Sequence, residues 1–260
     1  MNAIDVEQRV TINLSNQARA RMLSLPGEPL FIADWVGLFF LHFEVNAEAL
    51  QSEVPFPLDL YEGRAFVSLV SFQLERLRLF KAPSLTETVL RPFTRSHFLN
   101  VRAYVTHRGE PGIYFMQEFL SNKLSIPFGR PAYGLPYHHA AADRRIDDTS
   151  GHLDLRLCGE NRQAFINAAL QQEIAPKPCE DGSLAEFLLE RYTAYTCHCG
   201  VKRRFRIWHP VWEQRAVEFQ LHDEGLLKQS GAWFIHAQPG SGHLANIAKD
   251  VWMGRPVIVS

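Results

Sequence analysis

Residues 100–120, NVRAYVTHRGEPGIYFMQEFL, constrain the fold of this chain more than any other segment, because they have the pattern of two strands joined by a tight turn. The turn contains Gly109, Pro111 and Gly112, residue types that favour hairpin loops. Side chains alternate between the two faces of a strand, so one face of the first strand is apolar. The other face carries Asn100, Arg102, Tyr104 and Thr106. The segment predicts an antiparallel hairpin with a polar row along one face.

The same alternation predicts further strands over residues 30–45, 65–72, 151–158 and 201–209. Residues 65–72, AFVSLVSF, are apolar on both faces, which is typical of a strand buried on both sides. Capping residues mark two helix starts. Asn46 precedes a short helix through Ser52, and Ser183 forms an S-x-x-E capping box with Glu186. Together these elements predict an α+β fold.

The chain has 260 residues and shows no internal repeat, low-complexity linker or change of composition. A chain of this length can bury a sizeable core without disulfides or metals. We therefore predict a single domain over residues 30–260. Residues 6–24 are compatible with a helix and precede a break at Pro26-Gly27, so residues 1–29 are predicted to form an N-terminal helical arm on the surface.

The charge of the chain is balanced, with 27 basic and 28 acidic residues and a net charge of −1. This gives no general field for holding nucleic acid or an anionic membrane, so neither is expected as a partner. The most apolar run, residues 30–43, is too short to span a membrane and contains Asp34 and His42. No signal peptide is visible, and a cytoplasmic location is expected. A homo-oligomer is left open.

Common catalytic motifs are missing. The sequence lacks the G-x-S-x-G, H-E-x-x-H and G-x-x-x-x-G-K-[ST] patterns, which removes the best support for common hydrolases, zinc peptidases and P-loop proteins. Residues 197–199, Cys-His-Cys, are zinc-type ligands, with His138 and His139 far upstream. The paired C-x-x-C spacing of zinc sites is absent. We interpret these cysteines as turn residues and expect no metal and no cofactor.

Two groups of basic side chains each have two interpretations. The row formed by Lys202, Arg204 and Arg206 is most simply a solvated strand face, with contact to an anion or RNA as the alternative. Arg102 lies mid-strand on the same face as Asn100 and Tyr104. If that face lines a cavity, Arg102 is a fixed fork for a carboxylate or phosphate. If it faces solvent, the row is an ordinary surface ladder.

Five segments carry a resemblance to known proteins: EALQSEVPFPLDLYEGRAFVSLVSF (48–72), LNVRAYVTHRGEPGIYF (99–115), YGLPYHHA (133–140), LLERYTAY (188–195) and IWHPVWEQRAVE (207–218). In this order they resemble the YqjF-like proteins, an uncharacterised branch of the acetoacetate decarboxylase-like superfamily. The resemblance implies a mainly antiparallel β-barrel or cone with flanking helices and an internal cavity. It favours the cavity interpretation, with Asn100, Arg102 and Tyr104 as ligand-binding residues.

The founding enzyme of that superfamily forms a Schiff base on the first of two adjacent lysines that follow an aromatic-to-proline segment. The resemblance places Tyr137 and His138 of YGLPYHHA at those two positions. Neither a phenol nor an imidazole can form an imine with a ketone. The lysines of this chain are Lys81, Lys123, Lys177, Lys202, Lys228 and Lys249, and none follows a matching proline. We therefore predict that the protein does not decarboxylate acetoacetate through a Schiff base.

Two classes of function fit this combination. The first is an enzyme that uses the cavity for proton transfer, hydration or cyclisation of a small carbonyl compound. Arg102 would then clamp an anion, Tyr137 would donate a hydrogen bond, and His138 would act as general acid or base. The second is a binding or sensing module that performs no chemistry. The binding module would hold a small apolar or carboxylate ligand. A small-molecule partner bearing a carbonyl or carboxylate group is therefore expected, and the sequence leaves its identity open.

Overall fold

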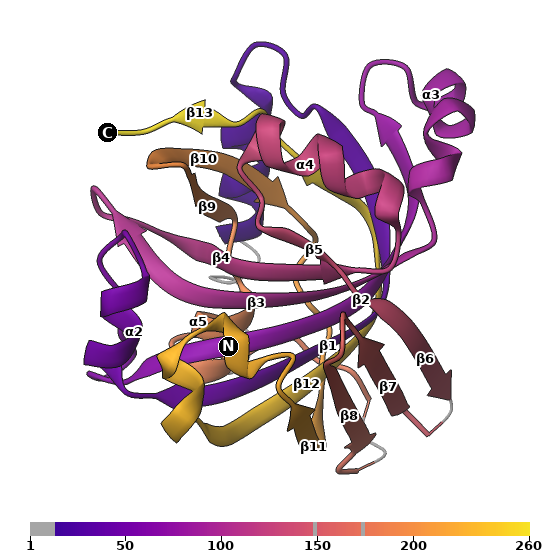
Figure 1. Ribbon diagram of the computed structural model, residues 1–260. Helices are drawn as coiled ribbons and strands as arrows, with labels where there is room; N and C mark the ends of the chain where they lie inside the picture. Colours follow the sequence, from indigo (N-terminus) through magenta and orange to yellow (C-terminus); the bar gives the residue numbers. More distant parts are fainter. Residues whose placement is uncertain (1–13, 148–149, 173–174) are drawn as a thin grey trace, which may run out of the picture.

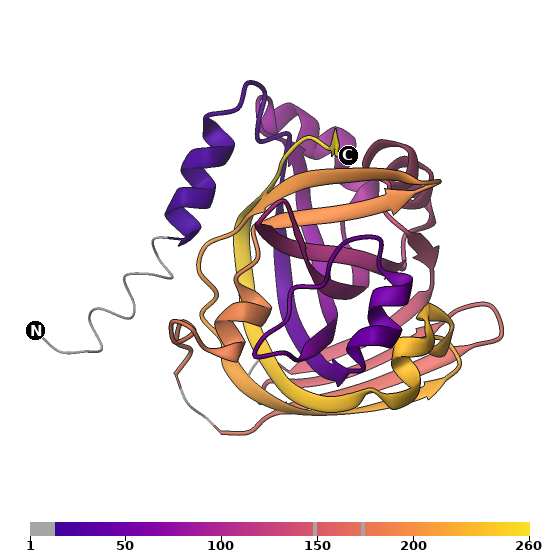
Figure 2. The same ribbon diagram turned by 90° about the vertical axis from the view of Figure 1, so that its left-hand side faces the viewer.

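The strands join into one sheet that bends round until two of its strands meet (Figure 1, Figure 2). The computed structural model describes residues 14–147, 150–172 and 175–260. The strands are β1 (Phe31–Val45), β2 (Ala65–Leu79), β3 (Ser96–His107), β4 (Glu110–Leu120), β5 (Tyr137–His139), β6 (Ala141–Asp147), β7 (His152–Cys158), β8 (Gln163–Leu170), β9 (Thr193–His198), β10 (Val201–Trp208), β11 (Arg215–Glu224), β12 (Gln238–Met253) and β13 (Val257–Ile258). The helices are α2 (Ala47–Glu53), α3 (Pro83–Leu90), α4 (Ile126–Tyr133), α5 (Leu184–Leu189) and one over residues 14–23, with 3-10 turns η1 (Arg91–Phe93), η2 (Lys123–Ser125), η3 (Lys228–Ser230) and η4 (Ala232–His236).

A ring of strands forms the centre of the molecule, in the order β10, β9, β4, β3, β2, β1, β12. Pairing of Ile207 with Met253 and of Trp208 with Trp252 joins β10 to β12 and closes this ring. From β12 the sheet continues outward through β11, β8, β7 and β6 (Figure 1). Its pairs are antiparallel apart from those of β4 with β5 and β9. The predicted fold, mainly antiparallel strands with flanking helices, is confirmed.

The ring strands β1, β2 and β3 are buried on both faces. Every ring strand contributes to an inner apolar cluster, which includes Phe40, Val70, Phe98, Phe115, Ala194, Phe205 and Ala245. The outer faces of β1, β2 and β3 belong to a second cluster, which β7, β8, β11, α2 and η4 cover. Ser68 and Val70 of β2 therefore face inward while Val67 and Leu69 face outward, as the apolar pattern of this strand predicted.

The β3–β4 hairpin is antiparallel as predicted, but its turn is shorter than expected. Arg108 and Gly109, both at positive φ, form a two-residue loop, so Pro111 and Gly112 lie inside β4. Gly112 has a different role: a Cβ there would lie 2.5 Å from the backbone oxygen of Thr193. The glycine permits the close parallel approach of β9 to β4.

Helices close the ends of the ring and support its outside. α5 begins at Ser183, whose Oγ accepts the backbone N–H of Glu186 as predicted, and places Leu188 and Leu189 in the inner cluster. α4 leads into β5 at the opposite end. The helix over residues 14–23 packs where the ring closes, with Met22 fully buried against Trp252. The preceding part of the predicted arm, residues 1–13, lies outside the described residues.

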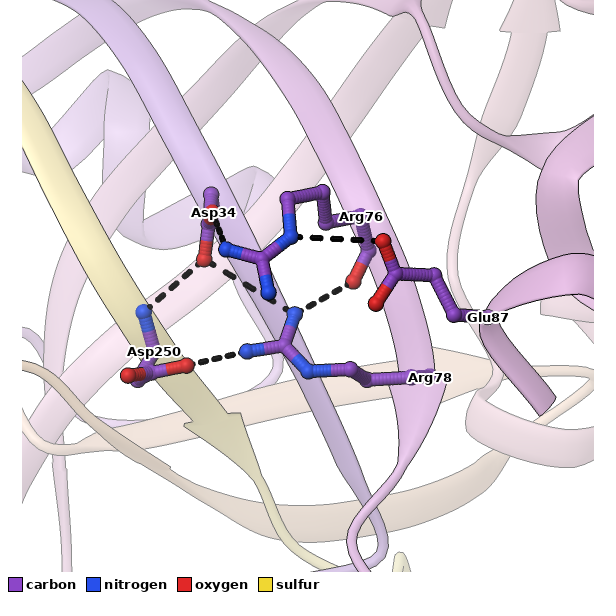
Figure 3. A network of polar contacts seen from close by, with 5 residues as sticks. All are labelled: Asp34, Arg76, Arg78, Glu87 and Asp250. Atoms are coloured by element: carbon purple, nitrogen blue, oxygen red, sulfur yellow. Dashed lines mark hydrogen bonds and ion pairs between the residues drawn. The ribbon is translucent and has the colours of Figure 1, made fainter. Parts of the chain in front are cut away.

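A charged network fixes the register at the start of β1, where the pairing shifts around Asp34 on both sides (Figure 3). The Asp34 carboxylate accepts from the backbone N–H of Asp250 at 3.0 Å and from Arg76 at 3.1 Å. Arg78 lies 3.8 Å from Asp34 and also contacts Asp250. These bonds replace ladder bonds lost at the irregularity and join β1, β2 and β12.

Candidate functional site

The polar row of β3 faces the inside of the ring. Asn100, Arg102 and Tyr104 are 6%, 7% and 1% exposed, so this row is buried and is not a surface ladder. On β1, which is separated from β3 by β2, His42 is also fully buried and faces the same interior. These polar groups interrupt an apolar cluster, and each needs a partner if burying it is not to cost free energy.

Arg102 is a buried cation with few partners. Its Nη2 donates to the backbone oxygen of Leu188 in α5 at 2.9 Å, and its guanidinium lies 5.4 Å from the ring centre of Phe40. Its Nε is buried without a hydrogen-bond partner, and no carboxylate among the described residues forms an ion pair with it. A buried charge without a counter-charge is costly, so this position suits an anionic group supplied from outside the chain.

A chain of short hydrogen bonds runs from α5 to His42. The Tyr104 hydroxyl lies 2.9 Å from the Leu188 oxygen and 2.6 Å from Ser68 Oγ, which in turn lies 2.6 Å from His42 Nδ1. A carbonyl only accepts, so Tyr104 donates to it, Ser68 donates to Tyr104, and His42 donates from Nδ1. His42 Nε2 is therefore left as a lone pair, and it is buried without a partner.

The pKa of His42 is well below its usual value, first because the ring is buried and then because of His243 and Arg102 nearby. The imidazole is neutral at pH 7 and can accept a proton through Nε2. This makes His42 a candidate general base inside the ring.

A cavity of about 70 Å³ lies at the end of the ring opposite α5. A single water needs a cavity of about 10–15 Å³, so this cavity admits a compound of a few heavy atoms. Its walls are aromatic and aliphatic, including Trp35, Phe72, Phe98, Phe115, Leu135 and Phe205. Its polar lining comes from Asn100, Glu118 and Tyr137. Asn100 Oδ1 and Glu118 Oε2 are buried without hydrogen-bond partners.

Burial sets the protonation of the cavity residues. It raises the pKa of Glu118 well above its usual value, which favours the neutral carboxylic acid. Burial, followed by the nearby Glu118, likewise raises the pKa of Tyr137 well above 10. At neutral pH the cavity therefore presents two O–H donors, from Glu118 and Tyr137, beside the free acceptor of Asn100. This set matches a carbonyl or carboxyl group.

The structure places Tyr137 in the same cavity as Asn100, whereas Arg102 and Tyr104 of the predicted row are not among the lining residues of that cavity, and His138 lies apart from it. β5 pairs in parallel with β4, so Tyr137 lies opposite Glu118 and faces inward. Gly129 of α4 leaves room for the ring, because a Cβ there would lie 2.1 Å from Tyr137 Cε2. His138 points to the other face, is exposed, and packs 5.8 Å from the ring of Phe119. Its pKa is lowered by partial desolvation of the ring, followed by the nearby charge of Arg130.

Two interior residues lay outside the sequence prediction of the site: Glu118 and Ser68. The sequence does mark Glu118 as unusual, because it is an acidic residue within the mainly apolar segment IYFMQEFL. In the structure it pairs with Asn100 across the hairpin. His42, which the sequence shows only as a polar residue within the most apolar run, lies in the same interior. The partner of its Nδ1 follows from strand pairing that the sequence does not show.

No lysine lines the cavity. Lys81, Lys123, Lys177, Lys228 and Lys249 are exposed, and Lys202 is half-buried on the outside of the ring, where its Nζ lies 5.0 Å from the ring centre of Phe56. Within the described residues, no group of three or more histidine, cysteine, aspartate or glutamate side chains is arranged to hold a metal. Nor do they include a helix long and apolar enough to cross a membrane.

Comparison with protein families identifies the family of this chain. The model of DUF2071, described as an uncharacterized conserved protein, matches residues 32–250. This chain belongs to the DUF2071 family. The uncharacterized protein YqjF of Bacillus subtilis (strain 168) is 31% identical to this chain over 208 residues, covering 79% of this chain and 83% of YqjF. The predicted relation to YqjF-like proteins is confirmed.

Solved structures show the fold of this DUF2071 member. An acetoacetate decarboxylase-like enzyme from Sphingomonas wittichii RW1 is similar with a TM-score of 0.65 at 11% identity, covering 90% of this chain and 94% of that one. Acetoacetate decarboxylase from Legionella pneumophila gives 0.63 at 14%, covering 92% and 94%. The enduracididine biosynthesis enzyme MppR, complexed with pyruvate, gives 0.62 at 12%, covering 89% and 91%. The acetoacetate decarboxylase-like fold is therefore shown.

Proposed function

We propose that this protein binds a small carbonyl- or carboxylate-bearing compound inside the strand ring, without forming an imine. The observation that carries the proposal is the set of buried polar atoms without partners, Asn100 Oδ1, Arg102 Nε and Glu118 Oε2, on neighbouring inward positions of β3 and β4. Such atoms are costly in a finished protein interior and are expected where a ligand completes the hydrogen bonding.

The same residues suggest how the ligand would be held. Glu118 and Tyr137 would donate to a carbonyl oxygen in the cavity, and Asn100 would accept from a hydroxyl or acid group. Arg102, two positions along β3 from Asn100, would supply the positive charge for a carboxylate. A 2-oxo acid such as pyruvate carries both groups, and pyruvate is the compound bound to MppR, a structural neighbour.

Proton transfer on such a compound is the catalytic form of this proposal. It is favoured by a free base, His42 Nε2, and a neutral acid, Glu118, facing one interior. His138, on the other face of β5, takes no part in this version of the site. The alternative is a binding module without chemistry. Incubation with pyruvate in heavy water separates the two: loss of the methyl proton signal reports catalysed enolisation, and an unchanged signal reports binding alone.

Binding itself is tested with Arg102→Met. Removing a buried, uncompensated charge should leave the free energy of unfolding unchanged or higher. Calorimetric titration should nevertheless show that pyruvate binding weakens by about tenfold or more, the expected loss for one charge-assisted hydrogen bond. Arg145→Met, at a side chain that is 80% exposed, is the matched control and should bind as the wild type does. Equal pyruvate affinity in both variants would contradict the proposal.

The absence of imine chemistry has its own test. The lysines are exposed or lie outside the ring, so none is desolvated as an imine-forming amine must be. Incubation with acetoacetate and borohydride should leave the intact mass unchanged. A stoichiometric adduct on a lysine, with release of carbon dioxide, would overturn this part.

A further inference from the structure

A basic groove lies outside the ring, away from the cavity. It has a volume of about 590 Å³ and runs between the helix over residues 14–23, the β3–β4 turn, β10 and the last residues of the chain. Its charged lining consists of Arg21, Arg108, Arg204 and Glu110, with His107 beside them. The volume falls in the range of about 300–1,000 Å³ that is typical of sites for small molecules.

Glu110 is the carboxylate of this groove, and its oxygens are already occupied. Oε2 accepts from Arg204 at 2.8 Å. Oε1 accepts from Arg206 at 2.9 Å and from the hydroxyl of Thr193 at 2.8 Å. Arg21 reaches the same oxygen only at 3.5 Å. The side chain of Arg206 is 10% exposed and approaches from the β10 side, so its charge offsets that of Glu110.

The groove therefore carries an excess of positive charge, with three arginines and one glutamate in its lining. Arg21 is 57% exposed, and Arg204 is 28% exposed. Arg108 is exposed, and its described hydrogen bonds go to the oxygens of Ser260. Each guanidinium has five N–H donors, and the described hydrogen bonds of Arg108 and Arg204 use few of them. In a protein with a net charge of −1, this local concentration of arginine creates a positive field that favours an anion.

We propose that this groove binds a small molecule carrying phosphate groups. Guanidinium forks match phosphate oxygens in pairs, and arginines from three separate elements can surround a tetrahedral anion. The volume exceeds what a single phosphate fills, which points to a diphosphate or a nucleotide. The basic face of β10, which the sequence suggested was solvated, thus forms one wall of the site. This proposal is independent of the ligand inside the ring.

His107 offers a local reporter. Its pKa is lowered first by desolvation and then by Arg108, Lys202 and Arg204, with Glu110 acting in the opposite direction. An anion in the groove counteracts those three cations, so the pKa of His107 should rise when phosphate binds. A purely structural arginine cluster would leave this pKa unchanged on addition of phosphate.

The experiment titrates the full chain with pyrophosphate by calorimetry, and follows His107 by NMR over the same additions. Pyrophosphate should bind with an affinity that falls as salt is added, and the pKa of His107 should rise. Arg21→Ala combined with Arg108→Ala should weaken binding about a hundredfold, roughly tenfold for each arginine. Both side chains are exposed, so the double variant is expected to fold. Arg145→Ala removes another exposed arginine, away from the groove, and should have no effect.

ADP in a second titration identifies the source of the phosphate groups. If ADP binds more tightly than pyrophosphate, the groove recognises a nucleotide. If the two bind equally, it recognises the diphosphate group alone. The absence of pyrophosphate and ADP binding, an unmoved pKa of His107, or equal affinity in the double variant and in Arg145→Ala would overturn the proposal. Because the groove lies outside the ring, Arg102→Met should leave pyrophosphate binding intact.

Discussion

At the scale of single residues, the interior of the ring depends on the direction of its hydrogen bonds. Ser68 links Tyr104 to His42, and all three side chains are essentially inaccessible to solvent. Ser68→Ala leaves the Nδ1–H of His42 without an acceptor, so we expect a loss of about 1–3 kcal/mol in the free energy of unfolding. Urea denaturation measures this loss, and NMR should show that wild-type His42 carries its proton on Nδ1.

A second buried serine provides the control. Ser96 is also fully buried, but its hydroxyl has no partner. Ser96→Ala removes an unsatisfied polar group and should change stability by less than about 0.5 kcal/mol, or raise it. Equal losses in the two variants would show that the Ser68 bonds contribute nothing beyond packing.

The sequence predicted some of these interior residues and not others, because it shows local strand alternation but not the pairing of distant strands. Strand alternation is a local property, so it placed Asn100, Arg102 and Tyr104 on one face. Which face points inward, and which side chains it contacts there, depends on pairing between distant strands. Glu118 and Ser68 joined the site through such pairing, opposite Asn100 and Arg102 respectively.

At the scale of elements, the network around Asp34 joins β1, β2 and β12 at a point where the register shifts (Figure 3). The side chains of Asp34 and Arg78 are each 6% exposed. Asp34→Ala leaves Arg78 and the backbone N–H of Asp250 without this carboxylate, so we expect a loss of about 3–5 kcal/mol in unfolding free energy. Chemical denaturation followed by circular dichroism measures it.

Glu87 belongs to the same network but is 39% exposed, and it contacts Arg76 at 3.3 Å. Glu87→Ala should therefore cost less than about 1 kcal/mol. A loss for Asp34→Ala as small as this would show that the network does not hold the strands in register. The sequence placed β1 correctly but not its irregularity, because a single aspartate in an apolar run says nothing about the arginines that reach it from β2.

At the scale of the whole molecule, the ring closes through β10 and β12, which lie more than forty residues apart in the chain. No local pattern predicts that closure, and here the resemblance to a known family supplied it. The same closure buries titratable groups of both kinds. Burial lowers the pKa of His243 to about 4 and raises that of Glu190 to about 7. Their contributions to stability therefore depend on pH in opposite ways.

His243→Gln and Glu190→Gln test this opposition. Because the folded pKa of His243 lies below its unfolded value of about 6.5, its contribution is complete above pH 6.5 and is lost as pH falls through 4. The folded pKa of Glu190 lies above its unfolded value, so its contribution is complete below about 4.5 and is lost as pH rises through 7. Each difference corresponds to about 3 kcal/mol. Urea denaturation from pH 4 to 8 measures the free energy of unfolding. Relative to the wild type, this free energy should increase for His243→Gln as the pH falls, and for Glu190→Gln as the pH rises. Parallel pH profiles for both variants and the wild type would show that folding shifts the pKa of neither His243 nor Glu190.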